Sequence, residues 1–326
     1  MKFRTFNHTD FSASEIGLGC WQLGGADWGE LSDQAAFEIL EQAVQCGINF
    51  FDTADVYGSG RSEELIGDFL KATSHPVFVA TKLGRKEIYP DNYTAATLRA
   101  ATEVSLQNLQ TEALDLTQLH CVPTAVLRRG EVFEWLRTLK QEGKIKSFGA
   151  SVESMEEALI CLEQEGLSSI QIIFNIFRQK PLTTLFEAAR AKSVALIIRL
   201  PLASGLLGGK MTKQSQFAAS DHRHYNRDGQ QFNVGETFAG IPFEQAIDLV
   251  EELRPLVPPE LTMAQWAMRW ILDHEAVTTV IPGATKTEQV ISNASAPDLP
   301  PLSEETHRRL RAFYEAKVAQ HIRGPY

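Results

Sequence analysis

An aspartate, a tyrosine, a lysine and a histidine follow three consecutive apolar segments, where their side chains would carry out acid–base chemistry together. Asp52 and Tyr57 lie in FFDTADVYGSGRSE, Lys82 ends VATK, and His120 ends LTQLH. Singly, each such residue is more often a turn, cap or packing residue than a catalyst. Four of them behind three successive segments are harder to explain by structure alone, so we predict a general acid site.

The chemistry of these residue types indicates how such a site would work. A buried lysine needs a carboxylate partner, which Asp52 would supply to Lys82. An ammonium beside a phenol favours the phenolate and lowers the tyrosine pKa from its usual value near 10. At an effective dielectric near 20 and about 4 Å, one charge contributes about 4 kcal/mol, enough to bring the pKa to about 7–8 if desolvation does not cancel it. We therefore predict that Lys82 lowers the pKa of Tyr57.

Eight short apolar segments alternate with amphipathic segments along most of the chain. Ser32, Ser154 and Thr262 stand where helix N-caps are expected, and Ser154 forms a capping box with Glu157. Eight strands alternating with helices predict an α/β fold, a closed (β/α)8 TIM barrel, with reacting groups at the carboxyl ends of the strands. The expected strands are Ile16–Cys20, Asn49–Asp52, Val77–Lys82, Asp115–His120, Ile145–Ala150, Ile170–Phe174, Val194–Arg199 and Val277–Ile281.

Two segments depart from this alternation. The residues before Ile16 predict a short hairpin that plugs the bottom of the barrel. Met211–Gly240 is polar, contains glycines and is too long for an ordinary connection, so we expect it to lie over the top face as a long loop after the seventh strand. Its His222 and His224 are expected to be solvated. No linker or repeat interrupts the chain, which predicts a single domain over residues 1–326.

Composition limits the possible partners. The 326 residues are 44% hydrophobic and carry a formal charge of −10, which disfavours nucleic-acid binding but leaves room for a local basic pocket for one small phosphate. No apolar segment is long enough to be a signal core or a membrane span, so we expect a cytoplasmic protein. The four dispersed cysteines indicate neither a zinc site nor a redox pair. They are Cys20, Cys46, Cys121 and Cys161.

The motifs together resemble those of a known family. In order, FFDTADVYGSGRSEELIG, VATKLG, DLTQLH, FGASVES, PLASGLLGGK and IPGATKTEQV are similar to the successive signatures of the aldo-keto reductases, over nearly the whole chain. The long loop resembles that of bacterial and plant members. The resemblance implies NADPH-dependent reduction of small aldehydes or ketones without a metal. It assigns Tyr57 as the proton donor, Lys82 held by Asp52 as its partner, and His120 as the group that orients the carbonyl.

The resemblance also implies contacts with NADP(H). Gly19, Cys20 and Trp21 would lie near the nicotinamide ribose, and Ser151 and Gln171 would bind the carboxamide. The loop after the seventh strand would follow the pyrophosphate, through Leu202, Ser204, Leu206 and Lys210. The segment after the eighth would hold the adenosine end, through Gly283, Thr285, Lys286, Gln289 and Asn293. Thr285 and Lys286 at the start of a helix suit a 2′-phosphate, which predicts a preference for NADPH.

Two positions depart from the family pattern. Val152 stands where many members have an asparagine that contacts the carboxamide. Arg199 stands where many have a tyrosine that stacks on the nicotinamide. A guanidinium can stack on a ring as well. Arg199 is therefore expected either to contact the cofactor, to bind a substrate anion, or to serve as a buried structural partner.

Two other functions stay open at this point. The same machinery can work oxidatively, as an NADP-dependent dehydrogenase of sugars or their lactols. A regulatory protein that retains the cofactor, like the potassium-channel β subunits, is the second alternative, although no partner-binding extension is evident. The expected partner is a small carbonyl compound or a sugar. The pocket that selects it depends on the loop Met211–Gly240, and the sequence does not predict an oligomeric state.

Overall fold

Eight parallel strands form a barrel in the computed structural model, which describes residues 1–6, 9–25 and 27–326. Neighbouring strands in the sheet are also neighbours in sequence, from β3 to β10. Parallel bridges from Ile16 to Val280 and from Gly19 to Gly283 join the first strand to the last. The predicted closed barrel is confirmed. Its strands are β3 (Leu18–Gly19), β4 (Phe50–Asp52), β5 (Phe78–Leu83), β6 (Leu114–His120), β7 (Ile145–Ser151), β8 (Leu167–Ile173), β9 (Ala195–Arg199) and β10 (Val277–Val280).

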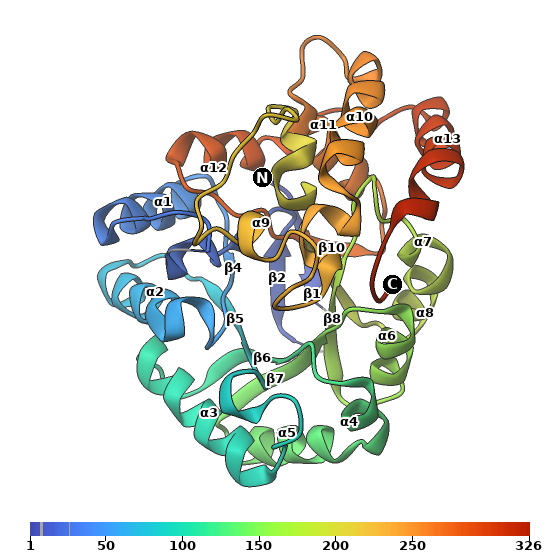
Figure 1. Ribbon diagram of the computed structural model, residues 1–326. Coiled ribbons are helices and arrows are strands. Elements are labelled where there is room, and N and C mark those ends of the chain that lie inside the picture. The colour runs from blue at the N-terminus through green and yellow to red at the C-terminus, as the bar shows by residue number, and fades with distance from the viewer. Residues whose placement is uncertain (7–8, 26) are drawn as a thin grey trace.

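Helices surround the strands as an outer layer (Figure 1). The three predicted caps are present, since Ser32, Ser154 and Thr262 each accept a hydrogen bond from a backbone N–H three residues later. No helix among the described residues is long and apolar enough to cross a membrane. The helices are α1 (Asp33–Gln45), α2 (Arg61–Ala72), α3 (Ala95–Leu109), α4 (Thr124–Arg129), α5 (Glu131–Gln141), α6 (Met155–Leu162), α7 (Pro181–Thr184), α8 (Phe186–Ala191), α9 (His222–Tyr225), α10 (Phe243–Leu253), α11 (Met263–Leu272), α12 (Thr287–Ala294) and α13 (Glu304–Phe313).

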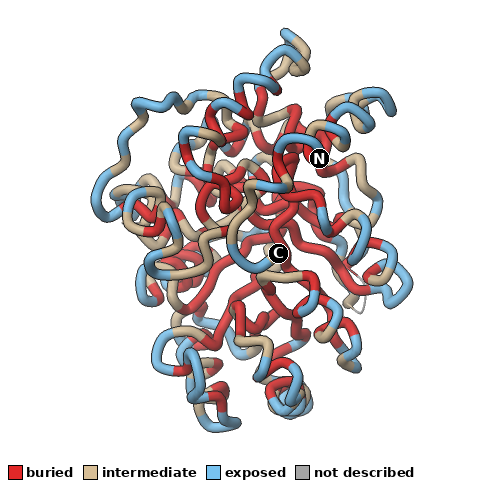
Figure 2. Tube along the Cα trace, turned by 45° about the vertical axis from the view of Figure 1, so that its right-hand side comes forward, coloured by how far each residue is buried: buried red, intermediate tan, exposed pale blue. Residues whose placement is uncertain are grey.

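The predicted hairpin closes the bottom of the barrel. Strands β1 (Phe3–Phe6) and β2 (Phe11–Ser14) pair antiparallel. Phe6 is completely buried, with its ring centroid 5.9 Å from that of Phe50 and 5.5 Å from that of Phe78. Buried residues accordingly run through the centre of the molecule, whereas exposed ones lie at its periphery (Figure 2). The lower half of the barrel is thus a packed apolar core.

The long loop Met211–Gly240 lies over the carboxyl ends of the strands, as predicted. It contains the short helix α9, drawn in yellow-orange in Figure 1. Asp27, from the segment after β3, fastens it: the Asp27 carboxylate accepts a hydrogen bond from the Tyr225 hydroxyl at 2.7 Å, and the Asp27 carbonyl accepts one from the His222 N–H at 3.0 Å. The expectation that His222 is solvated is wrong, because its side chain is fully buried under this contact.

Candidate active site

Lys82 lies at the centre of the group of four residues that the sequence singled out. Its ammonium donates to Asp52 Oδ1 at 2.5 Å, to the Thr53 carbonyl at 2.8 Å and to the Tyr57 hydroxyl at 3.2 Å. Strands β4 and β5 pair in register, with Asp52 opposite Ala80, which brings the ends of both strands to the same rim. All three ammonium hydrogens of Lys82 are therefore used, and one of them is directed at the phenol.

Asp52 is held from the opposite side by two carboxamides. Its Oδ2 accepts hydrogen bonds from Gln171 Nε2 at 2.6 Å and from Gln118 Nε2 at 3.2 Å. The carboxylate and the ammonium of Lys82 are both almost completely buried. Because both carboxylate oxygens of Asp52 have partners, the carboxylate is fixed in position and holds Lys82 in turn.

Tyr57 is positioned by a sharp turn after β4. Gly58 has φ 60°, and a Cβ at this position would lie 2.1 Å from the carbonyl oxygen of Gly24, so only glycine fits this close approach. The Trp21 ring stacks on Tyr57 at a centroid distance of 5.8 Å. The His120 ring meets Tyr57 edge-on at 6.0 Å. The phenol is thus enclosed by Trp21, Lys82 and His120.

The prediction that Tyr57 has a lowered pKa is wrong. Burial raises the pKa of Tyr57 to about 12, and the negative charge of Asp52 adds to this, although Lys82 opposes both. The attraction of the ammonium follows from the residue types alone, whereas the extent of burial depends on the folded structure. Burial also holds the pKa of His120 well below its usual value, reinforced by the charges of Lys82, Arg85 and Arg199. At neutral pH the site therefore contains a protonated phenol and a neutral imidazole.

A cleft of about 540 Å³ opens above these residues. Lys82 is almost completely buried and is not part of the cleft wall. Lys210 and Lys286 are exposed and Leu206 and Asn293 are buried, and none of the four is part of the wall. Their roles at the cofactor, like those of the residues in the wall, stay predictions. The predicted residues in the wall are Gly19, Cys20, Trp21, Asp52, Tyr57, His120, Ser151, Gln171, Arg199, Leu202, Ser204, Gly283, Thr285 and Gln289.

The far end of the cleft, before α12, has donors for an anion. The Gln289 side-chain oxygen accepts hydrogen bonds from the backbone N–H groups of Thr285 at 2.7 Å and Lys286 at 3.2 Å. Free N–H groups at a helix start bind phosphate oxygens in the same way. Gln289 is exposed, and these donors would become available to a phosphate if its side chain turned away.

Comparison with known proteins agrees with this geometry. The model of the Aldo/keto reductase family matches residues 15–315. The chain belongs to this family. It is 30% identical to the uncharacterized oxidoreductase YqkF of Bacillus subtilis, covering 98% of each chain, and 29% identical to the NADH-specific methylglyoxal reductase of Escherichia coli, covering 97% of this chain and 99% of the relative. The solved glycerol dehydrogenase AKR11B4 from Gluconobacter oxydans superposes with a TM-score of 0.78 at 28% identity, covering 99% of this chain and 97% of that one.

In this aldo/keto reductase, Arg199 is engaged by the protein itself. Its guanidinium pairs with the carboxylate of Glu236 in the long loop, and donates to the Val152 carbonyl at 3.0 Å. Of the three roles left open by the sequence, these contacts favour that of a buried structural partner. The pair also ties the long loop to the end of β9.

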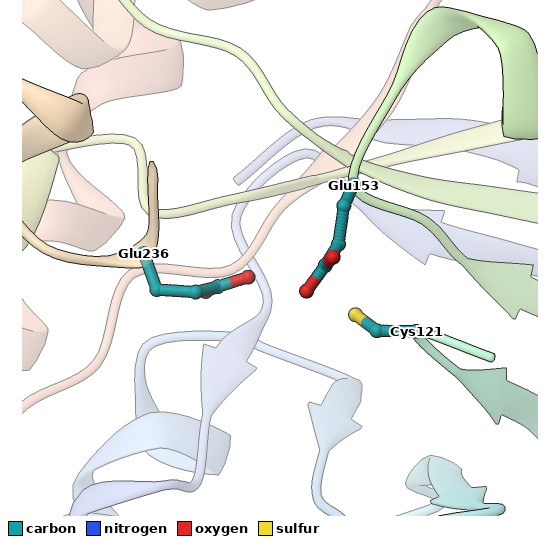
Figure 3. Close-up of side chains that lie close together, drawn as sticks. All are labelled: Cys121, Glu153 and Glu236. Carbon is teal, nitrogen blue, oxygen red and sulfur yellow. The ribbon is translucent and has the colours of Figure 1, made fainter. Parts of the chain in front are cut away.

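A second cluster lies beside Arg199. The side chains of Cys121, Glu153 and Glu236 point toward one another (Figure 3). Their atoms that could bind a metal, one from each side chain, all lie within 4.8 Å of one another. Burial raises the pKa of the Cys121 thiol to about 11, so the sulfur is protonated and a poor metal ligand at neutral pH. Arg199 pairs closely with Glu236, and Arg85 lies 3.5 Å from Glu153. We interpret the cluster as an ion-pair network of the aldo/keto reductase.

Several residues of the cleft wall were not predicted. Arg85 follows β5 by two residues and falls under the same strand-end rule that found Lys82, so that rule would have identified it. Seven others come from two loops that carry no strand or helix signal, and their positions depend on tertiary contacts. They are Asp27, Trp28, Arg223, Tyr225, Gln231, Phe232 and Glu236.

Proposed function

We propose that this protein reduces small aldehydes or ketones to alcohols with a nicotinamide cofactor, with Tyr57 as the proton donor. The observation that carries the proposal is the position of Tyr57 in the cleft wall, with its hydroxyl 3.2 Å from the buried ammonium of Lys82 and its ring beside a neutral histidine. This is the arrangement that general acid catalysis at a carbonyl oxygen requires.

Each residue has a separate task in this reaction. The reduced nicotinamide, when bound, supplies the hydride that the carbonyl carbon accepts. Tyr57, protonated because its pKa is about 12, donates its hydroxyl proton to the carbonyl oxygen. Lys82 then stabilises the phenolate that remains, and Asp52 keeps Lys82 in place. The neutral imidazole of His120 donates a hydrogen bond that orients the carbonyl and polarises it.

The proposed cofactor is NADP(H). At the start of α12, Lys286 supplies a cation, and the Thr285 hydroxyl and two backbone N–H groups would be available once the Gln289 side chain moves away from them. The one acid of this turn is Glu288. A ribose 2′-hydroxyl would call for a carboxylate acceptor, whereas these groups suit a phosphate. We expect at least tenfold higher kcat/KM with NADPH than with NADH, and expect Lys286→Glu to remove most of this difference. Equal kcat/KM values for the two cofactors in the wild type would contradict the assignment.

Oxidation of a sugar or polyol is the second candidate. It is supported by the similarity to a solved glycerol dehydrogenase. The test is a panel of aldehydes and ketones with NADPH and NADH, set against glycerol and aldoses with NADP+ and NAD+. We expect the highest kcat/KM in the reducing direction. Higher values for the alcohols would favour the oxidative function, and absence of turnover in both directions would favour a binding protein.

A further inference from the structure

Three arginines reach the wall of the cleft, and they differ in how fully the protein neutralises them. Arg199 pairs with Glu236 through both carboxylate oxygens. Arg223 donates to Asp221 from Nε at 2.9 Å and from Nη2 at 2.6 Å. Arg85 makes only one long contact with a carboxylate among the described residues, 3.5 Å from Nη2 to Glu153 Oε1. Its charge is the least compensated of the three.

The surroundings of Arg85 leave its hydrogen-bond donors available. The guanidinium lies over the Tyr89 ring at 4.5 Å and approaches the Cys121 thiol, neither of which neutralises a positive charge. Burial and the nearby charge of Glu236 raise the pKa of Glu153 to about 7, so its carboxyl is partly protonated at neutral pH. A guanidinium has five N–H donors in a planar fork that matches the two oxygens of a carboxylate. The donors that Glu153 leaves unused are free for an anion in the cleft.

The position of Arg85 places this anion site on the substrate side of the cleft. Arg85 follows β5, which also carries Lys82, and its charge helps to lower the pKa of His120 at the end of neighbouring β6. The residues assigned to the cofactor come instead from the ends of β3 and of β7 to β10. Trp21, Trp28 and Phe232 add flat apolar surfaces beside the reacting tyrosine. A molecule bound there would have its carbonyl at Tyr57 and a further group near Arg85.

We propose that Arg85 is a specificity-determining residue that binds a carboxylate of the substrate, so that the enzyme prefers aldehydes and ketones carrying a carboxylate over neutral ones. The proposal rests on the proposed reductase function and names its substrate class. A charged, partly buried hydrogen-bonded pair discriminates strongly against a neutral analogue, because the analogue leaves the guanidinium in the cleft without a partner.

The test compares matched substrate pairs with NADPH. The 2-, 3- and 4-carboxybenzaldehydes are measured against their methyl esters, and 4-oxobutanoate against its methyl ester, so that the position of the charge varies while the carbonyl stays the same. In the wild type we expect at least one acid to exceed its ester at least tenfold in kcat/KM. Arg85→Gln is expected to remove this preference mainly by raising KM for the acid, with the esters changed less than threefold.

Two further variants separate recognition from a structural role. Arg85→Lys keeps the charge and should restore part of the preference, whereas Glu153→Gln frees the guanidinium and should lower KM for the acids. Arg309→Gln is the matched control, because Arg309 is exposed on α13 and is not part of the cleft wall. If Arg85→Gln lowers kcat/KM equally for the acids and the esters, Arg85 has a merely structural role and the proposal is overturned. A wild-type protein that prefers none of the acids over its ester would also overturn the proposal.

A binding measurement keeps the proposal testable if turnover fails. Benzoate and benzamide are titrated into wild-type protein and Arg85→Gln, with tryptophan fluorescence as the signal, since Trp21 and Trp28 line the cleft. We expect benzoate to bind the wild type at least tenfold more tightly than the variant, and benzamide to bind both weakly. Arg85-dependent benzoate binding without any turnover would refute the reductase function and retain the anion site. Equal benzoate binding by both proteins would refute the anion site.

Discussion

At the scale of single residues, the site shows how burial and charge compete. Tyr57 lies beside an ammonium that favours the phenolate, yet its pKa is about 12 because burial and the negative charge of Asp52 disfavour the phenolate. Lys82 shows the opposite balance: burial alone would lower its pKa, but Asp52 and Tyr57 raise it above the usual value. The result is a phenol that stays protonated at neutral pH, next to a permanent positive charge, as the proposed role of proton donor requires.

Replacing Lys82 tests this arrangement. Lys82→Met leaves Asp52 without its ionic partner and removes the charge that stabilises the Tyr57 phenolate. We expect kcat to fall by about 10²–10⁴-fold, the range typical of general acid catalysis, with cofactor affinity changed only a few-fold. Steady-state kinetics and cofactor titration measure both, with the exposed Lys71→Met as the control. A kcat within threefold of the wild type would exclude Lys82 from the mechanism.

Asp55 is expected to make the free energy of unfolding depend on pH. Burial raises its pKa from 3.8 to about 7, with the charge of Glu63 adding to the shift, and its Oδ1 has no hydrogen-bond partner among the described residues. The folded state therefore binds more protons than the unfolded state between about pH 4 and pH 7, so the free energy of unfolding falls as the pH rises through this range. One such group changes it by at most about 1.4 kcal/mol per pH unit.

We expect Asp55→Asn to flatten this pH dependence and to be relatively more stable than the wild type at pH 8. Urea unfolding between pH 5 and pH 8 measures the effect. Glu153, whose pKa is also raised to about 7, should leave a smaller slope of the same sign. An unchanged slope in Asp55→Asn would show that this carboxyl is ionised in the folded protein.

At the scale of elements, the sequence predicts the repeating parts well and the long loop poorly. Strand order, helix caps and the plugging hairpin follow from local patterns, such as the alternation of apolar runs and the capping box at Ser154 and Glu157. The loop Met211–Gly240 is positioned by contacts from distant parts of the chain, including Asp27 with Tyr225 and Arg199 with Glu236. These pairs have no local signature, so the loop residues of the cleft could not be predicted.

The C-terminal segment adds another such contact. The Arg323 guanidinium donates to the Gly240 carbonyl and to the Asp228 carboxylate, each at 2.8 Å. Arg323→Ala removes both, and we expect proteolytic cleavage within residues 211–240 to become several-fold faster, with NADPH slowing cleavage in both proteins. The exposed Arg309→Ala serves as the control. Identical cleavage rates with and without Arg323 would show that the loop is held by other contacts alone.

At the scale of the whole molecule, the apolar residues that stabilise the fold and the polar residues of the candidate site lie at opposite ends of the barrel. The bottom is filled by the hairpin and its aromatic rings, whereas the polar groups of the site gather at the carboxyl ends of the strands. The grouping of Asp52, Tyr57, Lys82 and His120 was predictable because a barrel brings strand ends together whatever lies between them in sequence. The pKa of Tyr57 and the partners of Arg85 and Arg199 were not, since they depend on burial and on the loop.

Phe6 tests this separation. Its side chain is fully buried between Phe50 and Phe78, and Phe6→Ala should lower the free energy of unfolding by about 3–5 kcal/mol. Because the hairpin is remote from the cleft, we expect kcat/KM to stay within twofold at temperatures where the variant is folded. Denaturant unfolding and initial rates provide the two values. A large loss of kcat/KM in folded protein would mean that the N-terminal hairpin also affects the geometry of the site.

The proton donor is the central claim, and Tyr57→Phe tests it most directly. The change removes one oxygen and leaves the ring that packs between Trp21 and His120. We measure kcat for aldehyde reduction together with the dissociation constant of NADPH in the wild type and the variant. The account predicts a fall in kcat of about 10²–10⁴-fold with cofactor affinity unchanged within a few-fold. A variant that keeps more than half of the wild-type kcat would contradict it.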